Sequence, residues 1–168
     1  MRLPNIAILG ATGVVGREII KVTEELDIQY NSIKFLSSAK SAGSKIEFKG
    51  KEYTVEEATP ESFDDIDIVM ASAGGSTSQK FAPEIVKRNG VLIDNSSAFR
   101  MDKDVPLIIP EINFESINSS LISNPNCSTI QSLLVLNEIK KIYKISKIIY
   151  STYQSCSGGG KEELIELS

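Results

Sequence analysis

The sequence contains no histidine, no tryptophan and only two cysteines, Cys127 and Cys156. Two cysteines without a histidine argue against a zinc or iron–sulfur site. They also do not make the disulfide framework of a small secreted domain, so a reducing cytoplasm is the simplest setting. Because histidine is the commonest general base in enzymes, any proton abstraction has to use another group.

The chain also lacks a long apolar run and an excess of positive charge. No stretch is long enough to span a membrane, and we expect no signal peptide, because Met1 to Pro4 lead directly into an apolar segment. A formal net charge of −4 argues against non-specific nucleic-acid binding. With 168 residues, 41% hydrophobic and 24% charged, the chain is globular in composition and long enough for one domain and part of another.

Short apolar runs alternate with segments of helical periodicity along most of the chain. This alternation predicts an α/β fold with a parallel sheet. The predicted strands are residues 5–9, 32–36, 67–71, 91–93, 107–109, 121–122 and 146–154, and the predicted helices are 17–26, 79–89, 130–143 and 161–168. Residues 45–48 and 52–55 flank a glycine turn and read as a hairpin.

A glycine-rich turn, Gly10 to Gly16, joins the first strand to the first helix. Glycines let the backbone turn tightly and let a pyrophosphate approach the helix N-terminus. The spacing is Gly-x-x-Gly-x-x-Gly rather than the usual Gly-x-Gly-x-x-Gly, and alone it could be an ordinary strand-to-helix turn. Its place after the first strand favours a dinucleotide site.

The residues after the second strand indicate which dinucleotide. No Asp or Glu lies between Asp27 and Glu47, where an NAD-binding domain usually places an acid for the ribose 2′-hydroxyl. Ser38, Lys40 and Ser41 stand there instead and suit a 2′-phosphate. We therefore expect NADP, with a solvated loop as the alternative.

Five predicted loops follow strands and are expected at the carboxyl edge of the sheet, where ligands of open α/β sheets bind. They begin at or near Gly10, Ser38, Gly74, Asn95 and Asn126. Arg100, in the fourth loop, has a guanidinium suited to a phosphate or a carboxylate, or to a surface ion pair with Asp102 or Asp104.

Cys127 lies in the predicted opening turn of the helix that follows Pro125. Unpaired backbone N–H groups and the helix dipole at that position favour a nucleophilic thiolate. The alternative is a small buried hydrophobic residue. Cys156 has no basic neighbour closer than Lys161, and we interpret it as structural.

Five stretches together resemble the aspartate-semialdehyde dehydrogenase family, and the resemblance covers the whole chain in order. They are GATGVVG at 10–16, SAGGSTS at 72–78, DNSSAFR at 94–100, PNCSTIQ at 125–131 and STYQSCSGGG at 151–160. The resemblance implies a Rossmann-type NADP-binding domain in residues 1–125, followed by the beginning of an α+β catalytic and dimerisation domain in 126–168.

The resemblance implies a cytoplasmic enzyme that oxidises L-aspartate 4-semialdehyde to 4-phospho-L-aspartate with NADP and inorganic phosphate. In cells the reaction runs in reverse, toward lysine and diaminopimelate, threonine, methionine and isoleucine. Cys127 would form a thioacyl intermediate and Gln154 would orient the substrate, while Arg100 and Asn95 would hold the substrate or phosphate. The residues implied for NADP are Gly10, Thr12, Gly13, Val14, Val15, Ser38, Lys40, Ser41, Ser157 and Gly158.

Family members are roughly twice this long, in keeping with a two-domain enzyme. The resemblance places their catalytic histidine, further substrate residues and main homodimer or homotetramer interface beyond Ser168, so we expect residues 1–168 alone to be inactive. Two alternatives remain open: N-acetyl-glutamyl-phosphate reductase, which shares the fold and a cysteine nucleophile, and a non-catalytic NADP-binding or thiol-sensing module.

Overall fold

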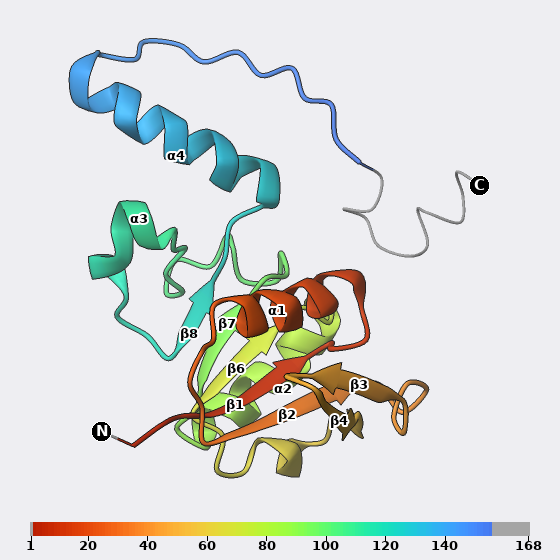
Figure 1. Cartoon of the computed structure of the whole chain (residues 1–168). Coiled ribbons are helices and arrows are strands. Elements are labelled where there is room, and N and C mark those ends of the chain that lie inside the picture. Colours follow the sequence, from red (N-terminus) through yellow and green to blue (C-terminus); the bar gives the residue numbers. More distant parts are fainter. Residues whose placement is uncertain (1, 156–168) are drawn as a thin grey trace.

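A computed structural model describes residues 2–155 of the chain. Its centre is a six-stranded parallel sheet in the order β5-β2-β1-β6-β7-β8 (Figure 1). The strands are β1 (Asn5–Leu9), β2 (Ser32–Ser37), β5 (Glu56–Glu57), β6 (Ile68–Ala71), β7 (Val91–Asp94) and β8 (Leu121–Ser123). The α/β prediction is confirmed, and the carboxyl ends of all these strands lie at one edge.

One helix covers each face of the sheet because successive residues of a strand point to opposite faces. Ile6 and Ile8 of β1 pack in a core cluster with Ile20 of α1 (Val14–Glu25). Ala7 and Leu9 pack in a second cluster with Phe81 of α2 (Gly75–Lys87). A strand buried on both faces reads as an unbroken apolar run, which is why β1 was found residue for residue.

The predicted hairpin is also present and extends the core on the α1 face. Strands β3 (Lys45–Phe48) and β4 (Lys51–Thr54) pair antiparallel around Lys49 and Gly50. The Phe48 ring is fully buried, and its centroid lies 5.6 Å from that of Phe35 on β2 in an edge-to-face arrangement.

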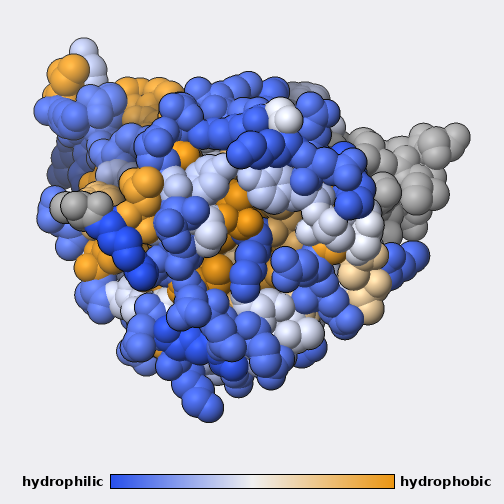
Figure 2. Space-filling view, turned by 60° about the horizontal axis from the view of Figure 1, so that its bottom comes forward, coloured by the Kyte–Doolittle hydropathy of each residue, from blue (hydrophilic) through white to orange (hydrophobic). Residues whose placement is uncertain are grey.

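Figure 2 shows hydrophilic residues over most of the face at the bottom of Figure 1, with hydrophobic residues between them.

The carboxyl-terminal part of the described chain leaves the sheet. After α3 (Pro110–Asn113), η2 (Phe114–Ser116) and β8, the helix α4 (Cys127–Ile142) projects away from the sheet (Figure 1). None of its residues is buried. No helix in residues 2–155 is long and apolar enough to cross a membrane.

The structure differs from the predictions in several places. Residues 146–154 form no strand, because a strand needs a partner for its hydrogen bonds and this segment has no strand partner in residues 2–155. Residues 107–109 contribute only an isolated bridge from Leu107 to Ser123. The helix expected from Gln79 begins at Gly75, and η1 (Pro60–Phe63) and β5 were not predicted. The helix predicted over 161–168 lies outside the described residues.

Candidate dinucleotide site and adjoining cysteine

The glycine turn brings three parts of the backbone into close contact. Gly10 has a φ of +88°, and a Cβ atom on it would lie 2.9 Å from the backbone of Ala73 in the turn after β6. A Cβ atom on Gly16, in the first turn of α1, would overlap the carbonyl oxygen of Gly10. Side chains at these positions would push α1 and the two turns apart, so the glycines set the spacing of this edge.

Two helices begin at this edge without side-chain caps. Gly13 is the N-cap of α1 and Gly74 is the N-cap of α2, and neither makes a side-chain capping hydrogen bond. The first N–H groups of a helix have no acceptor within the helix, so an anionic ligand at such an end supplies the missing partner.

A cavity of about 470 Å³ lies at the carboxyl ends of β1, β2 and β6. This is the point where the chain turns from one side of β1 to the other, since β2 and β6 flank it in the sheet. The volume falls in the usual range for ligand pockets. The lining combines backbone turns, hydroxyls, one carboxylate and one ammonium side chain with several apolar side chains: Leu9, Gly10, Thr12, Gly13, Ser37, Ser38, Ala39, Ser41, Glu57, Ala58, Ser72, Ala73, Thr77, Lys80 and Phe81.

Half of the residues predicted for the cofactor line this cavity: Gly10, Thr12, Gly13, Ser38 and Ser41. Val14 and Val15 begin α1 and are 42% and 49% exposed, outside the lining. Lys40 is exposed and also lies outside the lining. Ser157 and Gly158 lie outside the described residues, as does Cys156.

Two charged residues of the cavity were missed by the sequence argument. Lys80 lies on α2, and its Nζ atom lies 4.7 Å from the centroid of the buried Phe81 ring. Its spacing from Thr77 and Phe81 on one helix face could have indicated a shared site. Glu57 comes from β5, whose pairing with β2 has no signal in the sequence.

A second group of residues ties the loops after β7 and β8 together. Arg100 donates from Nε to the carbonyl oxygen of Asn124 and from a terminal nitrogen to that of Asn95, both at 2.9 Å. The Asn124 side-chain amide donates to Asn95 Oδ1 at 2.6 Å. The surface ion pair considered for Arg100 does not form with Asp102 or Asp104 in residues 2–155.

Asp94, which the sequence argument also passed over, anchors this loop from beneath. Its fully buried carboxylate accepts hydrogen bonds from Ser78 Oγ at 2.6 Å and Ser96 Oγ at 2.7 Å. These bonds join the end of β7 to α2 and satisfy the buried carboxylate. Asp94 therefore ties α2, which lines the cavity through Thr77, to the loop that leads to Arg100.

Cys127 is the first residue of α4 and is exposed. The interpretation as a buried hydrophobic residue is therefore wrong. Asn126 caps the helix by accepting from Ser128 N at 3.0 Å and Ser128 Oγ at 2.7 Å, and Cys127 Sγ lies 3.9 Å from the same Asn126 oxygen. The cap fixes the helix start, so the sulfur is presented beside the loop that holds Asn124 and Arg100.

Gln154 is not brought to this group by any contact of the described chain. It is exposed, in a segment without regular structure. No hydrogen bond within residues 2–155 joins it to Cys127 or Arg100. Its predicted substrate role stays a prediction.

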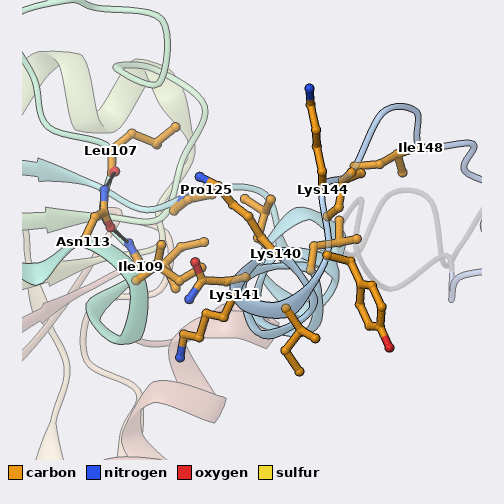
Figure 3. Close-up of a pocket in the computed structure, with 15 residues that line it drawn as sticks. Leu107, Ile109, Asn113, Pro125, Lys140, Lys141, Lys144 and Ile148 are labelled. Atoms are coloured by element: carbon orange, nitrogen blue, oxygen red, sulfur yellow. Dashed lines mark hydrogen bonds between the residues drawn. The ribbon is translucent and has the colours of Figure 1, made fainter.

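An apolar groove of about 840 Å³ separates α4 from the segment around α3 (Figure 3). On one wall Asn113 donates to the Leu107 carbonyl at 2.9 Å and accepts from the Ile109 N–H at 2.8 Å, which fixes this segment. The other wall includes Leu133, Leu136 and Ile142 of α4 and Ile148 beyond it. Its lining is mainly apolar, so it differs in character from the hydroxyl-rich cavity.

A parallel sheet with a glycine turn, two uncapped helix starts and a polar cavity at the strand-order reversal defines a nicotinamide-nucleotide-binding domain of Rossmann type. The family described as "Semialdehyde dehydrogenase, NAD binding domain" matches residues 5–120. The chain belongs to this semialdehyde dehydrogenase family.

Curated relatives of this chain within that family are aspartate-semialdehyde dehydrogenases. The chain is 49% identical to an aspartate-semialdehyde dehydrogenase of Bacillus subtilis over 97% of its length and 48% of the relative's. It is 51% identical to one of Campylobacter jejuni over 97% of its length and 49% of the relative's. The chain thus spans about half the length of the curated relatives it matches.

A solved structure shows the same fold. Aspartate semialdehyde dehydrogenase II of Vibrio cholerae, complexed with ASA, superposes with a TM-score of 0.94 at 40% identity. The match covers 99% of this chain and 51% of that one. The resemblance found in the sequence motifs is confirmed over the whole described sheet.

Proposed function

We propose that this chain supplies the cofactor site and the nucleophile of an NADP-dependent, phosphorylating aspartate-semialdehyde dehydrogenase. The enzyme would interconvert L-aspartate 4-semialdehyde and 4-phospho-L-aspartate, in the reducing direction for biosynthesis of lysine, threonine, methionine and isoleucine. The observation that carries this proposal is Cys127, exposed at the capped start of α4 on the sheet edge that also holds the polar cavity. The relatives' shared name supports the choice of substrate.

The cavity fits the phosphate-bearing part of a nicotinamide dinucleotide. Close backbone packing at Gly10 and Gly16 holds the glycine turn against α1 and against the turn after β6, and the uncapped starts of α1 and α2 suit a pyrophosphate. Ser38 and Ser41 supply hydroxyls and Lys80 supplies positive charge, which favours NADP. When bound, the nicotinamide supplies hydride transfer, while the residues of the cavity hold and orient it.

Cys127 would act as the nucleophile. In the oxidative direction its sulfur adds to the aldehyde carbon, and after oxidation the acyl group remains on sulfur as a thioester. Inorganic phosphate then attacks the thioester carbonyl, the carbon–sulfur bond breaks, and the acyl phosphate leaves with the thiolate restored. The N–H groups at the start of α4 stabilise negative charge at the sulfur.

Arg100 and Asn95 would bind the phosphate or the substrate beside the sulfur. The guanidinium carries five N–H donors, and two of its hydrogen bonds go to the carbonyls of Asn95 and Asn124. These bonds orient the rest of the fork, since the Asp94 carboxylate fixes the first loop through Ser96 and the Asp94 carbonyl accepts from the Asn124 N–H of the second at 2.8 Å. Gln154 would join this group when substrate is present.

The groove beside α4 supports the division into a first domain (1–125) and the beginning of a second (126–168). A helix without a buried residue and with a mainly apolar groove at its side needs a partner surface. We propose that this surface is the rest of a two-domain enzyme, which also supplies the proton acceptor, because these 168 residues contain no histidine. The complete enzyme would be a homodimer or homotetramer.

The test uses the 168-residue chain and the enzyme completed with the second half of a close relative. We expect the chain alone to bind NADPH and to be alkylated at Cys127, but not to reduce NADP⁺ with aspartate semialdehyde and phosphate. The completed enzyme should turn over, and Cys127→Ser should abolish both turnover and the thioester seen by mass spectrometry. A thioester that persists in the Cys127→Ser enzyme would refute the assigned nucleophile.

A further inference from the structure

The short strand β5 places a carboxylate in the candidate cofactor cavity. Glu57 pairs in parallel register with Ser37, the last residue of β2. The next amide, Ala58 N–H, donates to the Ser37 carbonyl at 2.8 Å and fixes this end of the strand pair. Both Glu57 and Ser37 line the cavity.

The register distinguishes Glu57 from its neighbour Glu56. Residues directly opposite in a pair of strands share a face of the sheet. Glu57 therefore shares a face with Ser37, whose Oγ lies 2.9 Å from Thr12 Oγ in the glycine turn. Glu56 pairs with Leu36, which is buried in the core on the opposite face, and Glu56 lies outside the cavity lining.

The carboxylate of Glu57 has no protein partner in the described chain. Within residues 2–155 it accepts no hydrogen bond and forms no ion pair, and the one hydrogen bond at this residue goes from Ser62 Oγ to its backbone carbonyl. An ionised carboxylate only accepts hydrogen bonds. A dinucleotide offers such a group its ribose hydroxyls and its amino groups as donors, and among these the adenosine 2′-hydroxyl is replaced in NADP by a phosphate, which repels a carboxylate.

We propose that Glu57 is a specificity-determining residue of the cofactor site, where it accepts a hydrogen bond from the adenosine ribose of NAD and opposes the 2′-phosphate of NADP. The inference rests on the proposed function, because it requires a nicotinamide dinucleotide in the cavity. Ser38, Ser41 and Lys80 favour binding of NADP. The carboxylate of Glu57, which comes from β5, weakens that preference. Glu57 therefore sets the ratio of the affinities for NAD and NADP at this site.

The experiment measures the dissociation constants of NADH and NADPH by fluorescence titration with the 168-residue chain. Three proteins are compared: the natural sequence, Glu57→Gln and Glu56→Gln. The two variants remove the same charge from adjacent positions of one exposed strand. Glu57→Gln should shift the ratio of the NADH and NADPH dissociation constants toward NADPH by about tenfold, as expected for a hydrogen bond to a charged group. Glu56→Gln should change the ratio by less than about twofold.

The outcomes separate this inference from the proposed function. If both dinucleotides bind and Glu57→Gln leaves the ratio as it is in the natural protein, Glu57 does not set specificity, although the cofactor site stands. If both variants shift the ratio equally, the effect is one of net charge and the inference is also wrong. If neither dinucleotide binds to any of the three proteins, the cofactor site itself is refuted.

Discussion

Residues Ile6 to Leu9 of β1 are all buried, whereas α4, the longest helix in residues 2–155, contains no buried residue. Both segments are rich in aliphatic residues. The difference is that β1 has layers on both of its faces within the chain, while α4 touches mainly the short α3. The cavity at β1 is therefore built by contacts that the chain itself completes, whereas the helix that begins at Cys127 is left uncovered in residues 2–155.

The largest effect that tests this comparison is on stability. Replacing Phe35→Ala, whose side chain is 1% exposed, should lower the free energy of unfolding by about 3–5 kcal/mol. Replacing Val135→Ala on α4, which is 61% exposed, should change it by less than about 0.5 kcal/mol. Urea unfolding of the 168-residue chain measures both. A large loss at Val135 would show that α4 is already covered, for example by a second copy.

The next effect concerns the glycine turn at the cavity. Gly16→Ala forces a methyl group against the Gly10 carbonyl, and we expect a loss of about 2–3 kcal/mol in the free energy of unfolding together with weaker NADPH binding. Gly50→Ala is the matched control, because its hairpin turn has a φ of +69° but open space around the new methyl. It should cost about 1–2 kcal/mol from backbone strain alone and leave NADPH binding unchanged. Equal effects on binding would contradict the assigned packing.

These two regions also explain what the sequence could and could not predict. Every strand of the sheet except the two-residue β5 was predicted, because each contains apolar residues that are buried or half-buried in the core, most completely in β1. The strand predicted over 146–154 contains the apolar pair Ile148 and Ile149, yet the segment is exposed and forms no strand, because strand pairing depends on a neighbour that a local pattern does not contain.

The residues of the candidate site also divide into those that the local sequence predicts and those that it does not. Gly10, Gly13 and Cys127 follow from local rules for turns and helix starts, and the structure places them where those rules put them. Lys40 was selected because it follows β2 in the sequence, but it lies outside the cavity. Lys80 and Glu57 reach the cavity from α2 and β5, so only the tertiary arrangement reveals them.

A smaller effect would sharpen the assignment of the cavity's positive charge. Lys80→Met should raise the dissociation constant of NADPH by about fivefold, the effect of losing one solvent-exposed charge contact to a phosphate. Lys40→Met removes the same charge from outside the lining and should change it by less than about twofold. Titration of both variants in parallel decides between the two lysines. A larger effect at Lys40 would restore the prediction made from sequence.

The smallest effect concerns the opposite edge of the sheet, where Asp67 holds the start of β1. Its carboxylate accepts hydrogen bonds from the Asn5 N–H at 2.7 Å and from Arg2 at 2.6 Å. The hydrogen bond from Asn5 is the main cause that lowers the pKa of Asp67 below its ordinary value, and the charge and hydrogen bond of Arg2 lower it further. A carboxylate with a lowered pKa in the folded state stabilises the fold above its ordinary pKa, and the contribution is lost as the pH falls through the lowered value, below about pH 4. The difference in urea midpoint between the natural chain and Asp67→Asn should therefore be largest near neutral pH and should shrink in acid. Arg2→Met, which leaves the Asn5 hydrogen bond in place, should remove only the smaller part of this difference. A difference that does not depend on pH would show that the Asp67 carboxylate does not stabilise the sheet through its charge.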